Sequence, residues 1–291
     1  MWINEFELPQ AAPPTGKVVP AGTTDVGPVP PNAQEWRVRG QMLRSLAAVF
    51  VDEPTTELLA ALRTPGWLAA VQATGLSFGD DFLCPDLNTL AQDLAVEYTS
   101  LFTCSGGFPP VESVRLTGRY HQTPETEVAA VYRRWGYVTG RSRFSLFADH
   151  LGVELSFVAE LMARGADCLD AQDQAGFSAI EKEIKRFWTL HLGRWARGYG
   201  QLLQRASSHS FYRVMGGLLN GFAEEELLAL GLHKVEDLDQ GRLEVPKSDI
   251  QVEFDPNEPV CNACGDESPQ LTPPKPGARV VPLRAVSDLD F

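Results

Sequence analysis

Residues 149–154, DHLGVE, place a carboxylate and an imidazole side by side, a pairing that can cap a helix, bind a charged group or assist hydrolysis. His150 and Glu154 are four residues apart and share one face if the stretch is helical. Asp149 precedes them, where a carboxylate can cap the helix N-terminus. Metal-dependent phosphohydrolysis would need a second set of His and Asp ligands, which the sequence does not offer. A satisfied interior histidine is the simpler alternative for His150.

A second stretch, residues 97–114, combines a helix end with an unusual loop. Tyr98 and Phe102 close an apolar helical stripe, and core packing is the simpler explanation for both. The following loop reads GGFPPVES, in which the glycines permit positive φ and the prolines disfavour helix before them. Glu112 follows the two prolines, either as a binding residue or as a buried hydrogen-bond partner that shapes the loop.

The pair Cys261 and Cys264 is the one metal-like motif in the sequence. A structural zinc site usually takes four ligands, and only one CxxC pair is present. Zinc or iron at these cysteines, a half-site completed by a partner, a redox-sensitive thiol pair and an unliganded tail all stay open. Apart from this pair, the sequence predicts no cofactor.

Several common catalytic signatures are missing from the sequence. There is no phosphate-binding loop of the Walker type and no HExxH. Glu-x-x-His, which di-iron helical bundles require, does not occur either. We therefore expect a binding protein and not an enzyme, with a nucleotide-hydrolysing helical enzyme or a metal- or redox-responsive scaffold as the alternatives.

The sequence around the candidate residues is dominated by helical periodicity. Alternating strand patterns are scarce, and no proline interrupts residues 125–245. The sequence predicts an all-α fold, a single helical bundle. Apolar residues recur at three- and four-residue spacing in the segments 43–50, 87–101, 128–135, 151–162, 180–195 and 211–222.

Proline content divides the chain into three parts. Seven of the 21 prolines lie in residues 1–33 and eight in residues 246–291. We therefore predict a proline-rich, largely irregular N-terminal tail over 1–33, a helical domain over 34–245, and an acidic proline-rich tail over 246–291 that contains the CxxC pair.

Charge and hydropathy limit the partners and the compartment. Residues 224–291 hold 15 acidic and 6 basic side chains, which does not suit a nucleic-acid surface. The N-terminus is acidic where a secretory signal needs positive charge, and the apolar stretch 46–51 is too short to span a bilayer. We expect a cytoplasmic protein without stable membrane insertion, and pairing of two copies stays open.

Taken together, the two stretches resemble the molybdoenzyme chaperone family, TorD/DmsD/NarJ-like. The resemblance rests on Tyr98 with Leu-Phe at a helix end, a Pro-x-Glu-Ser loop, and Asp-His-x-x-x-Glu-Leu-x-Phe starting at Asp149. It continues through Phe187, His191, Trp195 and the pair at 211–212, and covers roughly residues 36–230. Arg115, where many relatives have an aromatic residue, departs from the family pattern.

The resemblance implies a function that composition alone does not. Such chaperones bind the N-terminal peptide, often a twin-arginine export signal, of a molybdopterin-containing oxidoreductase catalytic subunit and hold it until the cofactor is inserted. Carboxylates accept bidentate bonds from guanidinium, so acidic side chains can meet the arginines while an apolar groove takes the rest. The implied peptide-binding residues are Asp149, His150, Glu154, Tyr98, Phe102 and Glu112.

Overall fold

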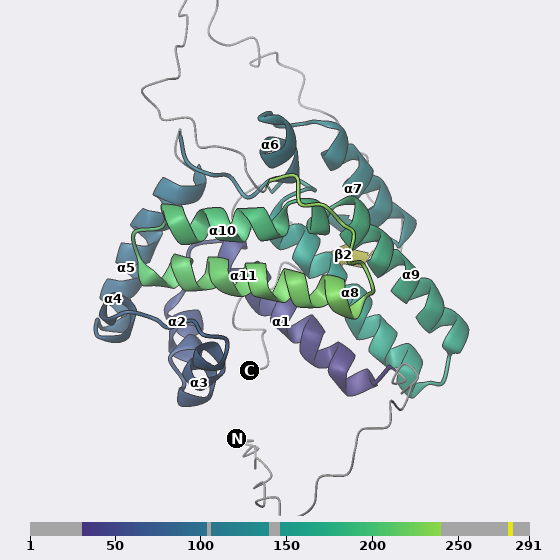
Figure 1. The fold of residues 1–291 in the computed structure, drawn as a ribbon, viewed down its shortest axis with the longest axis horizontal. Coiled ribbons are helices and arrows are strands. Elements are labelled where there is room, and N and C mark those ends of the chain that lie inside the picture. Colours follow the sequence, from purple (N-terminus) through teal and green to yellow (C-terminus); the bar gives the residue numbers. More distant parts are fainter. Residues whose placement is uncertain (1–30, 104–105, 140–145, 240–278, 282–291) are drawn as a thin grey trace, which may run out of the picture. The chain divides into compact units, whose positions relative to one another are not determined.

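The computed structural model describes residues 31–103, 106–139, 146–239 and 279–281, and all of the elements within them belong to the unit formed by residues 32–291 (Figure 1). The helices are α1 (Ala33–Val51), α2 (Thr56–Leu62), α3 (Pro65–Ala73), α4 (Asp80–Leu83), α5 (Leu87–Tyr98), the π-helical turn η1 (Thr99–Thr103), α6 (Glu112–Thr117), α7 (Thr123–Arg134), α8 (Leu151–Asp170), α9 (Gln174–Leu190), the 3-10 turn η2 (Leu192–Arg194), α10 (Ala196–Ala206) and α11 (Ser210–Ala229). The strands are β1 (Tyr137–Thr139) and β2 (Arg279–Val281). The predicted all-α class is confirmed.

Several helix starts follow from their capping residues. Asn32 accepts from the backbone N–H of Gln34 at the start of α1, and Asp86 accepts from two N–H groups at the start of α5. Pro124 lies in the first turn of α7, where its missing N–H has no helical partner to lose. Each predicted apolar stripe lies on a helix or begins on one.

The core is built from closely packed helix pairs. α1 and α9 both pack against α8, and α10 runs beside α11 (Figure 1). Glycines allow the closest approaches: a Cβ on Gly152 of α8 would lie 3.0 Å from the Ala47 carbonyl of α1. At the second pair, a Cβ on Gly200 of α10 would lie 2.5 Å from the Gly216 carbonyl of α11. Side chains larger than glycine would push these helices apart.

One helix prediction is wrong. The stripe from Ile180 to Trp195 predicted a single long helix, but α9 ends at Leu190 and the chain turns through η2 before α10 begins. His191 adopts a non-helical conformation, with φ −126° and ψ −100°. The His191 ring is buried against Glu112, which lies in another segment. A helix that continued through His191 would point this ring in another direction.

The strand pairing was not expected either. β1 and β2 form a two-stranded parallel sheet in which Tyr137 pairs with Arg279, Val138 with Val280 and Thr139 with Val281. β2 therefore brings part of the predicted irregular C-terminal tail back to the helical unit. Residues 1–30, 240–278 and 282–291 lie outside the described residues, so the predicted domain boundaries stay predictions. Within the described part of the chain, no helix is long and apolar enough to cross a bilayer.

The α10–α11 contact gives a direct test of the packing. We expect Gly216→Ala to destabilise the fold by about 1–3 kcal/mol, because the new Cβ would lie 2.7 Å from the Gly200 carbonyl and 2.9 Å from the Leu203 Cβ. The matched control is Gly221→Ala on the same helix, where no atom lies within 4 Å of the added Cβ. That change should be neutral or stabilising by up to about 1 kcal/mol. Urea unfolding of both variants measures the difference, and equal effects would contradict the packing.

Candidate functional site

The Gly-Pro loop is joined to the start of α8 by backbone hydrogen bonds. The N–H of Glu112 donates to the Asp149 carbonyl at 2.9 Å, and the N–H of Leu151 donates to the Pro110 carbonyl at 2.8 Å. These bonds form an isolated antiparallel bridge between Val111 and His150. The two stretches singled out in the sequence therefore meet in space. We call residues 110–113 and 149–151 the clamp.

Asp149 does not cap its own helix, although its position before α8 left that role open. Its Oδ2 accepts from the backbone N–H of Ser113 at 2.8 Å, inside the first turn of α6. The residue before α6, Val111, provides no capping side chain, so Asp149 supplies the missing acceptor from another segment. His150 takes the predicted role instead: its Nδ1 accepts from the N–H of Gly152 at 3.1 Å.

His150 is neutral in this arrangement. Burial lowers the pKa of His150 to about 3. A protonated Nδ1 could not accept the Gly152 hydrogen bond, so the cap and the neutral ring require each other. His150 therefore acts in this structure as an acceptor and not as a charged group.

Glu112 has a partner that the sequence analysis did not assign to the site. Its Oε2 accepts from the His191 Nδ1 at 3.0 Å, and both side chains are buried. His191 comes from the break between α9 and η2, 79 residues along the chain. A signal was present in the sequence, because His191 is the polar member of an otherwise apolar buried stripe.

Glu154 is the least compensated carboxyl of the cluster. Burial raises the pKa of Glu154 well above its usual range, and the nearby carboxyls of Glu112 and Asp149 raise it further, while the Trp195 indole opposes the shift. Among the described residues, neither Glu154 oxygen makes a hydrogen bond of good geometry. This environment favours the protonated form of Glu154, which reduces the repulsion between three buried carboxyl groups.

Tyr98 and Phe102 belong to the aromatic core and not to this polar cluster. The Tyr98 hydroxyl donates to the Phe50 carbonyl at 3.0 Å. The Phe102 ring meets those of Phe50, Tyr98 and Tyr212 edge-on, with centroids 5.0–6.0 Å apart. All six residues predicted to bind a peptide are at most 5% exposed in this conformation. Their role in binding stays a prediction.

No metal site is found among the residues with defined placement: none of their His, Cys, Asp and Glu side chains form a group of three or more suited to a metal ion. The predicted metal ligands Cys261 and Cys264 lie outside the described residues.

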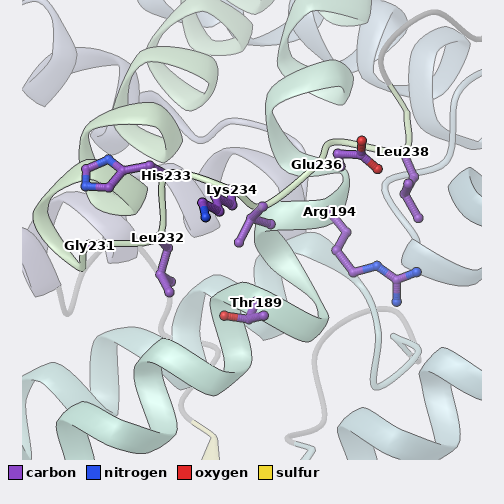
Figure 2. A pocket seen from close by; sticks show the side chains of 9 residues that line it. Thr189, Arg194, Gly231, Leu232, His233, Lys234, Glu236 and Leu238 are labelled. Carbon is purple, nitrogen blue, oxygen red and sulfur yellow. The ribbon is translucent and has the colours of Figure 1, made fainter.

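Two cavities border α9, and the larger of these two lies away from the predicted residues. It measures about 660 Å³ and is formed by the end of α9, η2 and the segment after α11 (Figure 2). Leu238 fixes that segment by donating its N–H to the Arg194 carbonyl. The cavity mixes cationic, acidic and apolar side chains, so it favours no single ligand class. Its lining residues are Thr189, Arg194, Gly231, Leu232, His233, Lys234, Val235, Glu236 and Leu238.

Comparison with known proteins finds one family model. Residues 80–199 match the family model of the nitrate reductase delta subunit. This segment of the chain is therefore similar to the nitrate reductase delta subunit family. The predicted resemblance to the TorD/DmsD/NarJ-like chaperones is confirmed. The family indicates a chaperone of redox-enzyme maturation, and the clamp, Glu154 and His191 all lie within the matched segment.

The other comparisons add little to the family assignment. A crystal structure of a candidate redox enzyme maturation protein from Archaeoglobus fulgidus is 18% identical, with 64% of this chain and 93% of that chain covered. Its TM-score is 0.35, which is too low to support an argument. The curated proteins contain no match.

The buried carboxyl groups near the clamp predict a specific pH dependence of stability. A raised folded-state pKa means that Glu154 contributes most to stability below its unfolded pKa, and that this contribution is lost as pH rises. Glutamine imitates the protonated acid, so Glu154→Gln should gain stability relative to the wild type as pH rises from the unfolded-state pKa of a glutamate toward the raised folded-state pKa, at no more than about 1.4 kcal/mol per pH unit. Urea unfolding at several pH values measures the difference, and a pH-independent difference would contradict a raised pKa of Glu154.

Proposed function

We propose that this chain binds the N-terminal peptide, often a twin-arginine signal, of a molybdopterin-containing oxidoreductase catalytic subunit. It holds that subunit in the cytoplasm for cofactor insertion before export or assembly. It acts as a binding protein and not as an enzyme, without a cofactor of its own. The observation that carries the proposal is the clamp with its surplus of buried carboxyl groups, inside the segment that matches a family of maturation chaperones.

Charge supports a cationic ligand at this position. Glu112, Asp149 and Glu154 bring three carboxyl groups together, and among the described residues only Glu112 pairs with a basic side chain, His191. Among the described residues, Asp149 Oδ1 and Glu112 Oε1 make no hydrogen bond of good geometry, and the Glu112 carboxyl also interacts with that of Glu154. A guanidinium group presents several N–H donors in a plane and fits such acceptors well. Its positive charge would also offset the repulsion among the three carboxyl groups.

The clamp must open before a peptide can reach these carboxyls. Three hydrogen bonds hold it closed: Glu112 N–H to the Asp149 carbonyl, Leu151 N–H to the Pro110 carbonyl, and Ser113 N–H to the Asp149 carboxylate. Each of these hydrogen bonds contributes on the order of 1 kcal/mol net to the closed state. The binding free energy of a tightly bound peptide can offset the loss of these bonds.

An opened loop would also bring Tyr98 and Phe102 toward the apolar part of the peptide. The loop is anchored to η1 by the hydrogen bond from the Phe108 N–H to the Leu101 carbonyl, one residue before Phe102. Moving residues 106–111 would uncover part of the aromatic core beneath them. In our proposal, the arginines meet the carboxyls and the apolar residues of the peptide meet this uncovered surface.

Capture of the tagged full chain from the cytoplasm of its own organism tests the function. We expect a molybdopterin oxidoreductase catalytic subunit to co-purify with the chain. We expect this subunit to be absent from the purified sample when its first residues are deleted. A synthetic peptide with that N-terminal sequence, called here the client peptide, should then bind the purified chain. Co-purification that survives the deletion would contradict recognition of the N-terminal peptide.

The clamp gives the sharpest mutational prediction. Asp149→Asn keeps an oxygen for the Ser113 N–H but removes the negative charge, so we expect it to weaken client-peptide binding about 10-fold or more, measured by isothermal titration calorimetry. The matched control is Asp173→Asn, which changes another capping aspartate, at the exposed start of α9, and should leave binding unchanged. Helical far-UV signal must be retained in both. Equal affinities of the wild type and both variants would refute the proposed role of Asp149.

A further inference from the structure

A short two-stranded sheet pairs two segments that are far apart in the chain. β2 contributes three residues, is preceded by 39 residues outside the described range, and pairs with β1 in parallel. Pro282 follows directly, and proline cannot donate to a strand ladder. A parallel pair of this length is weak, because each hydrogen bond contributes on the order of 1 kcal/mol net. β2 can therefore leave β1 at low cost.

β1 does not depend on β2 for its position. The Tyr137 side chain is buried, and its ring meets the Phe157 ring of α8 edge-on with centroids 5.6 Å apart. The guanidinium of Arg164, also on α8, lies 6.0 Å from the Tyr137 ring centroid. Removal of β2 would leave β1 fixed to the helical unit with a free edge, which is the surface that an extended peptide adds to.

This edge is linked to the clamp through shared neighbours. Tyr132, just before β1, donates its hydroxyl to the Ala148 carbonyl at 3.0 Å, next to Asp149. The rings of Tyr132 and Tyr137 both pack on Phe157, two turns into α8 from the clamp. A peptide that pairs with β1 would thus lie on the same helix that begins at the proposed arginine site.

The sequence around β2 has the chemistry expected of the ligand. Residues 276–287, PGARVVPLRAVS, contain two arginines and no acidic residue, with apolar residues between and after them. Residues 240–275 differ sharply, with seven acidic and three basic side chains. The strand that occupies β1 is therefore a basic and apolar segment within an acidic tail, like the N-terminal peptides that the proposed function assigns as clients.

We propose that the edge of β1 docks the client peptide in extended conformation, and that residues 279–281 fill this edge in the same chain until the client displaces them. The inference rests on the proposed function and adds a second contact to it. A strand on the same chain competes at an effective concentration in the mM range, so it blocks weak peptides and yields to strong ones.

Two truncated chains form a matched pair for the test. A chain ending at Ala278 lacks β2, and a chain ending at Val281 keeps it. A fluorescent synthetic peptide of residues 276–287 is the probe, and its anisotropy reports binding. We expect the chain ending at Ala278 to bind the probe about 10-fold more tightly than the chain ending at Val281, and the client peptide to displace it. If the shorter chain is unfolded by circular dichroism, the full chain carrying Val280→Gly and Val281→Gly replaces it, with the same expectation.

The outcomes separate this inference from the proposed function. Equal binding of the probe to both chains, or no binding to either, overturns the docking edge. If the client peptide binds the full chain but does not displace the probe, the inference fails and the proposed function stands. If the client peptide binds none of the chains, the proposed function fails and the inference fails with it.

Discussion

The clamp is the constraint on which the rest of the site depends. Buried backbone N–H and carbonyl groups must be paired, and a loop with two consecutive prolines has few donors with which to build regular structure. The short bridge to α8 satisfies this need through Glu112, Leu151 and the Asp149 carboxylate. The same bonds fix the start of α6, the start of α8 and the path of the loop between them. Loss of the bridge would release all three together.

The electrostatics of the cluster follow from this closed geometry. His150 must be neutral to cap α8, so it cannot balance the carboxylates beside it. His191 reaches Glu112 only because the helix breaks after Leu190, which explains why the apolar stripe of α9 does not continue as one helix. Glu154 is left without a basic partner among the described residues, and burial with its carboxyl neighbours raises its pKa. In our account, a guanidinium from a client supplies the partner that the closed structure lacks.

Much of the fold could be predicted from the sequence, because helical periodicity is local. The stripes at 43–50, 128–135, 151–162 and 211–222 each lie on one helix, and Pro124 marks the start of α7 as expected. The features that were missed depend on contacts between distant segments. No local pattern indicates that Asp149 caps α6 or that residues 279–281 return to β1.

The candidate site was only partly predictable. Asp149, His150, Glu154 and Glu112 could be chosen by residue type and by resemblance, and the structure brings these four together. Tyr98 and Phe102 could not be separated from core residues, since an apolar stripe on a helix has the same pattern in either role. His191 was visible only as a polar residue on a buried stripe, and its partner lies 79 residues away.

Amide hydrogen exchange of the full chain with and without the client peptide tests the central claim most directly. The account predicts that the peptide alters exchange at the amides of Glu112, Ser113 and Leu151, which hold the clamp closed. Unchanged exchange at these amides, with new protection confined to residues 231–238 around the larger cavity, would contradict it and move the binding site to that cavity.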